Sequence, residues 1–195
     1  MSEDHRHGPT WYKAAAGGCL RRLTASQQDA DMDGGEDADF GTNIHAWLKW
    51  YHQPSHEDVL APEPLLNSLR PQTKAGKDKG CSERELVNRY AAKVPSAAFG
   101  RPVLLETQLK GTVAGQPATG ILDLVADLDR AAVEFWQGYR GVTLEPGRYL
   151  IDHKTKTQHS ALMVEQFNVD PQFTMYHLLA QQAGLGELKG TLVNI

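Results

Sequence analysis

The stretch Leu150-Ile151-Asp152-His153-Lys154-Thr155-Lys156 decides the fold. Two apolar residues lead into Asp152, and Lys154 follows two positions later. Because side chains alternate between the two faces of a strand, Asp152 and Lys154 are predicted to share one face. Charges at the end of a buried strand have to be paired with each other or bound to a metal ion. The stretch therefore predicts a strand that ends either in a local Asp–Lys ion pair or in a functional site.

Two other predicted strands precede this one, and each carries an acid. Val103–Gly111 contains Glu106, and Ala118–Asp127 contains Asp123 inside an otherwise apolar run. Consecutive strands are usually neighbours in a sheet, so these acids are expected to converge with those of the third strand, Arg148–Lys154. Carboxylates brought close together repel one another unless a cation lies between them, and hard oxygen ligands suit Mg²⁺ or Mn²⁺. A lysine beside such an ion can orient water or neutralise charge that develops on a phosphate.

The clearest helix pattern covers Phe40–Gln53. Apolar residues recur there at the spacing of one helix face, at Ile44, Trp47, Leu48 and Tyr51. His45 lies at the border of this face. It is either an ordinary half-buried helix residue or a ligand that completes the acidic site, and a histidine ligand would shift the preference from Mg²⁺ toward Mn²⁺.

Three more regular elements are predicted farther along the chain. Ser82–Val94 opens with the capping box Ser-Glu-Arg-Glu and reads as a helix. Asp170 followed by Pro171 predicts the start of a helix that runs to about Ala183. Lys189–Ile195 reads as a last strand. Because the sequence stops inside this apolar run, the natural chain is expected to continue past its final residue.

Four stretches have weaker patterns. Trp11–Thr24 is predicted as a first helix, and Asp29–Asp39 as a solvated acidic loop. Pro54–Gly80 reads as a long connection. Ala131–Gly147, which contains three glycines and a proline, is predicted as a turn with an inserted stretch. The chain is thus expected to comprise residues 1–40, a helix with an acidic loop, and residues 41–195, the main domain.

The composition is that of a globular protein. A length of 195 residues with 41% apolar residues is enough for one domain with a proper core. No run approaches the roughly 18 apolar residues of a membrane span, and the polar N-terminus is unlike a signal peptide, so a cytoplasmic location is expected. Cys19 and Cys81 cannot build a four-cysteine metal site alone, and a bridge between them is disfavoured in a reducing compartment. Residues 41–195 hold 16 acids and 16 Lys or Arg, so bulk charge neither indicates nor excludes a nucleic-acid partner.

At this point the residues resemble a known family. Four motifs in order, Gly41–His45, Gly120–Asp123, Ile151–Thr155 and Gln172–Tyr176, resemble those of the PD-(D/E)xK nuclease superfamily. The most similar branch is the RecB-like one, with the RecB nuclease domain, the AddAB nucleases and the CRISPR-adaptation nucleases. The resemblance covers about residues 40–195. It implies an α/β fold with a restriction-endonuclease-like core, a mixed central β-sheet flanked by helices.

The resemblance also implies roles for individual residues. The metal ligands would be His45, Asp123, Asp152 and the backbone carbonyl of His153. Glu106 is a candidate additional acid because of its place in the first strand, not because of the resemblance. The catalytic residues would be Asp123, Asp152, Lys154, Gln172 and Tyr176. The last two are four positions apart on one helix face, from which they could hold the lysine or the DNA backbone. Weaker candidates for nucleic-acid contacts are Arg70, Lys74, Lys77, Lys79, Trp136, Tyr139 and Arg140.

The chain departs from the family in three respects. It lacks the four cysteines of the iron–sulfur branch. The gap from Asp123 to Asp152 is long, which predicts an enlarged hairpin around Trp136, Tyr139 and Arg140; these residues could stack on single-stranded bases or simply pack over the sheet. No helicase P-loop motif is present, so any unwinding motor would be a separate helicase or recombination protein.

The function implied is that of a divalent-metal-dependent deoxyribonuclease. It would use one or two Mg²⁺ or Mn²⁺ ions and act as an exonuclease on single- or double-stranded DNA in repair, recombination or phage DNA processing, in a bacterium or its phage. Two alternatives remain open. One is a catalytically silent nucleic-acid-binding or scaffold module of a larger nuclease complex. The other is a different metallohydrolase built on His153, His159 and His177, whose irregular spacing matches no ligand motif.

Overall fold

The structure is a computed structural model that describes residues 35–55, 60–61, 82–154, 167 and 170–194. The predicted helix over Trp11–Thr24 lies outside the described residues, and so does most of the connection Pro54–Gly80. Within the described ranges, no helix is long and apolar enough to cross a membrane.

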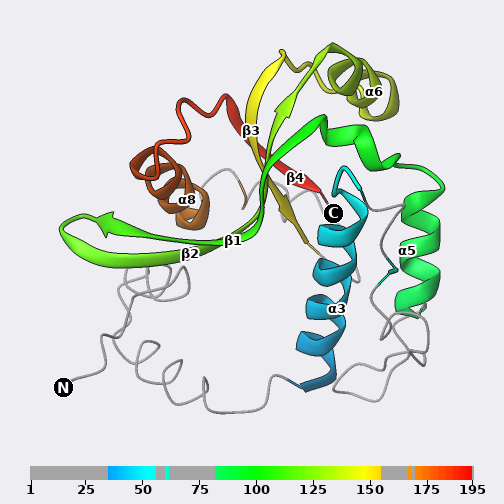
Figure 1. The fold of residues 1–195 in the computed structure, drawn as a ribbon, viewed down its shortest axis with the longest axis horizontal. Helices are drawn as coiled ribbons and strands as arrows, with labels where there is room; N and C mark the ends of the chain where they lie inside the picture. Colours follow the sequence, from blue (N-terminus) through cyan, green and yellow to red (C-terminus); the bar gives the residue numbers. More distant parts are fainter. Residues whose placement is uncertain (1–34, 56–59, 62–81, 155–166, 168–169, 195) are drawn as a thin grey trace.

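Four strands form one mixed sheet in the order β1-β2-β3-β4 (Figure 1). The strands are β1 (Arg101–Val113), β2 (Gln116–Leu128), β3 (Gly147–His153) and β4 (Gly190–Asn194). β1 pairs with β2 and β2 with β3 in antiparallel fashion, whereas β3 and β4 are parallel. All four strands were predicted close to these bounds, although β1 and β2 are longer than expected.

Helices flank this sheet on more than one side. They are α3 (Gly35–Tyr51), α5 (Glu83–Ala91), the 3-10 helix η2 (Ser96–Phe99), α6 (Arg130–Arg140) and α8 (Pro171–Gln182). Leu124 and Ile151 are fully buried in one core cluster with residues of η2 and α6. Val125 and Leu150 are fully buried in a second cluster with residues of α8. The predicted fold, a mixed sheet flanked by helices, is confirmed.

α3 packs against α5 beside the sheet (Figure 1). Ile44, Trp47 and Leu48 are buried in the contact, together with Val87 of α5. The apolar spacing in the sequence thus predicted the buried face of α3 correctly. The helix begins earlier than predicted, because Gly35 and the four residues after it are helical rather than part of an acidic loop.

The predicted helix starts at Ser82 and Asp170 are confirmed. Ser82 is the N-cap of α5, and its hydroxyl accepts a hydrogen bond from the backbone N–H of Glu85 at 3.2 Å. Asp170 is the N-cap of α8, and its carboxylate accepts from the backbone N–H of Gln172 at 2.9 Å. These caps satisfy backbone groups that have no partner within the helix.

The prediction of a turn with an inserted stretch over Ala131–Gly147 is wrong, because α6 occupies most of it. Asp129 caps this helix through a 2.9 Å hydrogen bond from the backbone N–H of Ala132. The sequence did not predict this helix because it contains Gly138, and glycine has a low helix propensity. Gly141 does not interrupt it but ends it, with the positive φ of 68° that is typical of a glycine after a helix.

Trp136 fixes α6 to the rest of the core. Its indole is buried, stacks on Phe99 at a centroid distance of 4.9 Å and donates a 2.7 Å hydrogen bond to the carbonyl oxygen of Ala98. The ring therefore packs over the sheet, the second of the two roles considered for it.

Candidate metal centre

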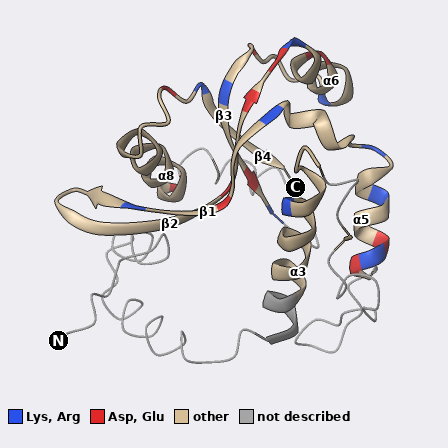
Figure 2. Cartoon of the chain, viewed as in Figure 1, with Lys and Arg blue, Asp and Glu red and all other residues tan. Residues whose placement is uncertain are grey.

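Three potential metal ligands meet where α3 crosses the hairpin of β1 and β2. The Nδ1 atom of His45 lies 3.1 Å from Oε1 of Glu106 and 3.5 Å from Oδ1 of Asp123. One ligand atom from each of the three residues lies within 4.8 Å of the others. Figure 2 shows acidic positions on the central strands beside α3. The sequence placed His45 and Asp123 in such a site and offered Glu106 as an additional acid.

The hairpin changes conformation at this point. Leu105 pairs with Leu124 and Thr107 with Leu122, but the ladder does not include the intervening Glu106. Glu106 has a φ of 43°, in the left-handed region that costs a non-glycine residue about 1–2 kcal/mol. Such strain persists only where surrounding contacts hold it, and it is concentrated at functional sites.

The alternation of side chains along β2 is also interrupted here. Leu122 packs in the cluster of α8, whereas Leu124, two positions later, packs in the opposite cluster of η2 and α6. Two positions apart on a regular strand would mean one shared face. The two strands therefore turn at Glu106 and Asp123, and this turn is where the two acids meet His45.

The charges of the cluster are mutually dependent. Burial opposes protonation of His45, but hydrogen bonds and charge from Asp123 and Glu106 outweigh it and raise the pKa of His45 to about 10. Burial likewise raises the pKa of Asp123, yet the hydrogen bond and charge of His45 outweigh it and lower that pKa below its usual value. A positive imidazolium thus lies where two carboxylates converge, which is where a cation is needed.

The spacing of the three ligands suits a small divalent ion. Mg²⁺ takes octahedral ligands at about 2.1 Å, so adjacent ligand atoms around it lie about 3 Å apart. The contacts of 3.1 and 3.5 Å from the His45 nitrogen to the two carboxylates are close to this separation. Histidine with two carboxylates is a donor set that Mn²⁺ also accepts. His45, Glu106 and Asp123 therefore fit a divalent cation.

A second group of polar residues surrounds Asp152, which is only 2% exposed. Oδ1 of Asp152 accepts hydrogen bonds from Nζ of Lys154 at 2.9 Å and from Nε2 of Gln172 at 3.3 Å. The same Gln172 nitrogen lies 3.1 Å from the hydroxyl oxygen of Tyr176. Gln172 and Tyr176, predicted to share a face of their helix, thus both contribute to the surroundings of Asp152.

The other oxygen of Asp152 is less well satisfied. Oδ2 lies 2.8 Å from the Lys154 ammonium, but it is buried and makes no hydrogen bond of good geometry within the described part of the chain. Burial raises the pKa of Asp152, and the nearby Lys154 charge only partly opposes this effect. The ion pair with Lys154 offsets part of the cost of burying this carboxylate oxygen, and a metal ion beside it would offset more.

Asp123 links the two groups. Its Oδ1 atom faces His45, while its Oδ2 atom accepts a 2.7 Å hydrogen bond from the backbone N–H of His153. His153 stands between Asp152 and Lys154 in the chain, so Asp123 holds the backbone that carries both. The backbone carbonyl of His153 stays a predicted ligand. Binding of the same ion by Asp152 and Asp123 also stays a prediction, because Asp152 is not part of the cluster of His45, Glu106 and Asp123.

The side chain of His153 belongs to a buried network that the sequence did not reveal. Its Nδ1 atom lies 2.9 Å from the amide nitrogen of Asn194, which also donates to the hydroxyl of Tyr90 at 3.1 Å. The Tyr90 hydroxyl contacts His52 Nε2 at 3.1 Å, and His52 Nδ1 donates to the carbonyl of Ser96 at 2.8 Å. Burial lowers the pKa of His153 to about 3, so the ring is neutral.

Gly120 shows why the second motif contains a glycine. A Cβ atom at this position would lie 2.5 Å from Cε1 of Tyr176, which is too close for any side chain. The glycine therefore lets α8 approach β2 and brings Tyr176 to the site.

The remaining predicted residues are distributed as follows. Tyr139 and Arg140 lie at the end of α6 and line a pocket beside Lys154. The weak candidates Arg70, Lys74, Lys77 and Lys79 lie outside the described residues. Of the rival histidine set, His153 contacts Asn194 and His177 contacts Thr191 at 2.9 Å, so these two make separate hydrogen bonds, and His159 is not described.

Comparison with known proteins gives one match. A family model described as the PD-(D/E)XK nuclease superfamily matches residues 10–195, nearly the whole chain. No curated protein and no solved structure matches significantly.

Proposed function

Because the chain belongs to the PD-(D/E)XK nuclease superfamily, we propose that it is a divalent-metal-dependent deoxyribonuclease that hydrolyses phosphodiester bonds at the site around Asp123 and Asp152. Membership implies a nuclease with a nucleic-acid substrate. The proposal adds DNA as that substrate, Mg²⁺ or Mn²⁺ as the ion, and exonuclease action in repair, recombination or phage DNA processing. Exonuclease action and the RecB-like branch rest on the order of the motifs. A separate helicase or recombination protein as partner follows from the lack of a helicase P-loop motif in the sequence.

One observation carries the proposal. A donor set suited to a cation, formed by His45, Glu106 and Asp123, lies one hydrogen bond from the backbone that presents Asp152 and Lys154. An ordinary Asp–Lys ion pair at a strand end would not need this cluster. The same observation disfavours the silent binding module, because the acid–acid–lysine set is intact.

The residues divide the work of hydrolysis between them. A divalent ion bound by His45, Glu106 and Asp123 would polarise the phosphate and lower the pKa of a bound water. Lys154 presents an ammonium beside the acids, where it can position the attacking water and neutralise charge developing on the phosphate. Asp152 orients this ammonium through contacts of 2.8 and 2.9 Å, and Gln172 in turn holds Asp152.

The remaining side chains maintain this geometry. The hydrogen bond from the His153 N–H keeps Asp123 facing His45. The hydroxyl of Tyr176 accepts a hydrogen bond from Gln172, and its ring packs against Gly120 of β2. Burial raises the pKa of Tyr176, so its hydroxyl stays neutral and acts through hydrogen bonds.

The proposal is tested by incubating the protein with linear DNA labelled at either the 5′ or the 3′ end, with Mg²⁺, Mn²⁺ or EDTA. We expect cleavage with a metal and none with EDTA. Loss of one label as single nucleotides would indicate an exonuclease and its polarity, whereas internal fragments would indicate an endonuclease. An RNA of the same sequence is the matched substrate control. Absence of cleavage with every metal and substrate would favour the silent binding module.

A further inference from the structure

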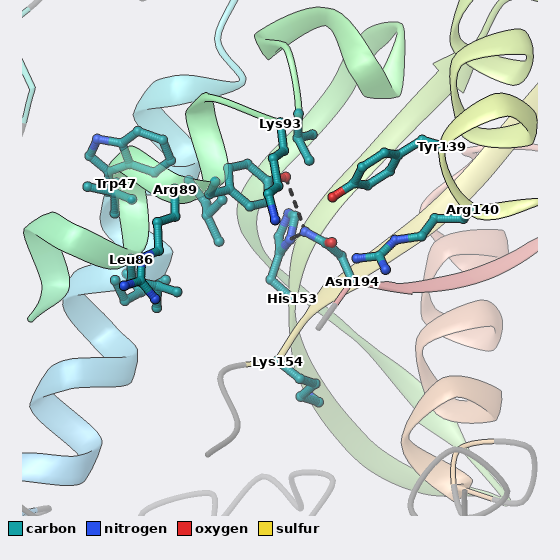
Figure 3. A pocket seen from close by; sticks show the side chains of 14 residues that line it. Trp47, Leu86, Arg89, Lys93, Tyr139, Arg140, His153, Lys154 and Asn194 are labelled. Carbon is teal, nitrogen blue, oxygen red and sulfur yellow. Dashed lines mark hydrogen bonds between the residues drawn. The ribbon is translucent and has the colours of Figure 1, made fainter. Parts of the chain in front are cut away.

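A pocket of about 270 Å³ opens beside the metal centre, between α3, α5, the end of α6 and the ends of β3 and β4 (Figure 3). Its floor is apolar and is formed by buried residues of the α3–α5 contact, Ile44, Trp47, Leu48 and Val87. His153 and Lys154 form its side toward the catalytic residues. The pocket is therefore continuous with the proposed site, although none of the three clustered metal ligands lines it.

The polar lining of this pocket is positively charged. Four basic side chains line it, Arg89, Lys93, Arg140 and Lys154, and no acid of the described chain does. Arg89 is paired with Glu85 and Lys154 with Asp152. Lys93 and Arg140 are exposed and form no ion pair with any described residue. In a protein whose net charge is −4, this gathering of cations without acids points to an anionic ligand.

Aromatic rings stand next to these cations. Tyr139, at the end of α6, is 36% exposed and lines the pocket. It stacks on Phe135 at 5.4 Å, which fixes its ring, and the Arg140 guanidinium lies over it at 4.7 Å. Figure 3 shows Tyr139 and Arg140 across the opening from Lys93. An exposed aromatic ring with an arginine beside a basic groove is an arrangement that contacts unpaired bases and their phosphates.

The volume of the pocket favours a single unpaired nucleotide over a base pair. The volume of about 270 Å³ is just below the range for small-ligand sites, about 300 to 1,000 Å³. A single nucleotide suits such a space, whereas a stacked base pair with two backbones does not. Its lining also includes the buried apolar side chains of α3 and α5, which an unpaired base can contact and a duplex groove cannot.

We propose that this pocket binds one unpaired nucleotide of a single DNA strand, next to the phosphate that is cleaved. Lys93 and Arg140 contact its phosphates, and the base lies against Tyr139 and the apolar floor. The proposal rests on the proposed function for the position of the cleaved phosphate, because Lys154 belongs to both. It defines the substrate at the site as a strand that is single-stranded on at least one side of the reacting bond.

The first test measures binding of a fluorescein-labelled single-stranded oligothymidine by fluorescence anisotropy in EDTA, where no cleavage can occur. We expect Lys93→Glu and Arg140→Glu to weaken binding by about tenfold or more each. The slope of log affinity against log salt should also become shallower, by about 0.7 for each phosphate that the variant no longer neutralises. Arg130→Glu is the matched control, since Arg130 is exposed at the other end of the same helix and does not line the pocket. It should change affinity less than about threefold by bulk charge alone.

A second pair of variants tests the base contact. Tyr139→Ala should weaken binding, and Tyr139→Phe, which keeps the ring, should restore it. A hairpin duplex of the same length should compete poorly. Equal losses for Arg130→Glu and Arg140→Glu would overturn the pocket as the binding site, and a duplex that binds as tightly as the single strand would overturn the unpaired nucleotide.

The two proposals fail in different ways. If DNA is cleaved with metal but the KM is the same for wild type, Lys93→Glu and Arg140→Glu, the pocket proposal is wrong and the nuclease stands. If the oligonucleotide binds in a pocket-dependent manner but is never cleaved, the pocket stands and the nuclease proposal is wrong.

Discussion

Lys154→Ala is expected to lower the rate of DNA cleavage by at least about a hundredfold, the usual loss when one preorganised charge-stabilising group is removed. Metal affinity should stay the same or rise slightly. Nζ of Lys154 contacts only Asp152 among the acids of the site, and it is not part of the cluster around His45. Removing the positive charge of Lys154 also reduces the electrostatic repulsion that a cation bound at this cluster would experience. The measurement is cleavage with Mn²⁺ together with Mn²⁺ titration by calorimetry.

A thermal melt of the same variant separates catalysis from packing. Removing Lys154 leaves the buried Asp152 without its cation, and this carboxyl, whose pKa is already raised, can take up a proton instead. The melting temperature is therefore expected to fall modestly while the variant remains folded. A folded variant that cleaves DNA at the wild-type rate would show that Asp152 and Lys154 form only a structural ion pair.

Asp123→Asn is expected to remove metal binding and cleavage together. The amide keeps the shape of the carboxylate and can still accept the hydrogen bond from His153, but it loses the negative charge that faces His45. Cleavage should fall below detection and the calorimetric signal for Mn²⁺ should disappear. The loss of both properties would distinguish this ligand from Lys154, for which only cleavage is expected to be lost.

Asp127→Asn is the matched control on the same strand. Asp127 forms a two-point ion pair with Arg148, with contacts of 2.6 and 3.0 Å, and a 2.6 Å contact with Arg101, away from the metal cluster. The hydrogen bond from Arg148 outweighs burial and lowers the pKa of Asp127. This variant should lose about 1 kcal/mol of stability and keep cleavage. If Asp127→Asn lost cleavage as completely as Asp123→Asn, the loss would reflect damage to β2 rather than a missing ligand.

The sequence predicted much of this arrangement because the signals were local. An acid inside an apolar run marked Asp123, and the alternation along β3 marked Asp152 and Lys154. The caps at Ser82 and Asp170 and the apolar face of α3 follow from side chains close in sequence. Such features depend on few residues and can be inferred without the rest of the fold.

The features that were missed depend on distant contacts. The left-handed conformation of Glu106 occurs where its side chain meets His45 of α3, 61 positions away in the sequence. Asn194 reaches His153 because β3 and β4 pair in parallel, a register that no turn sequence encodes. α6 was hidden because Gly138 lowers its propensity, and the burial of Trp136 against Phe99 and Ala98 compensates. In each case tertiary packing overrides the local signal.

The most direct test of the central claim is anomalous diffraction at the manganese edge from crystals grown with Mn²⁺. We predict a peak with ligand distances of about 2.1 Å to Nδ1 of His45 and Oδ1 of Asp123, with Glu106 or Asp152 as a further ligand. This peak would show that the ion replaces the proton on Nδ1 of His45, between the two carboxylates. A protein that cleaves DNA with Mn²⁺ but binds the ion elsewhere, with His45 still paired to Asp123, would contradict the assignment of this cluster as the metal centre.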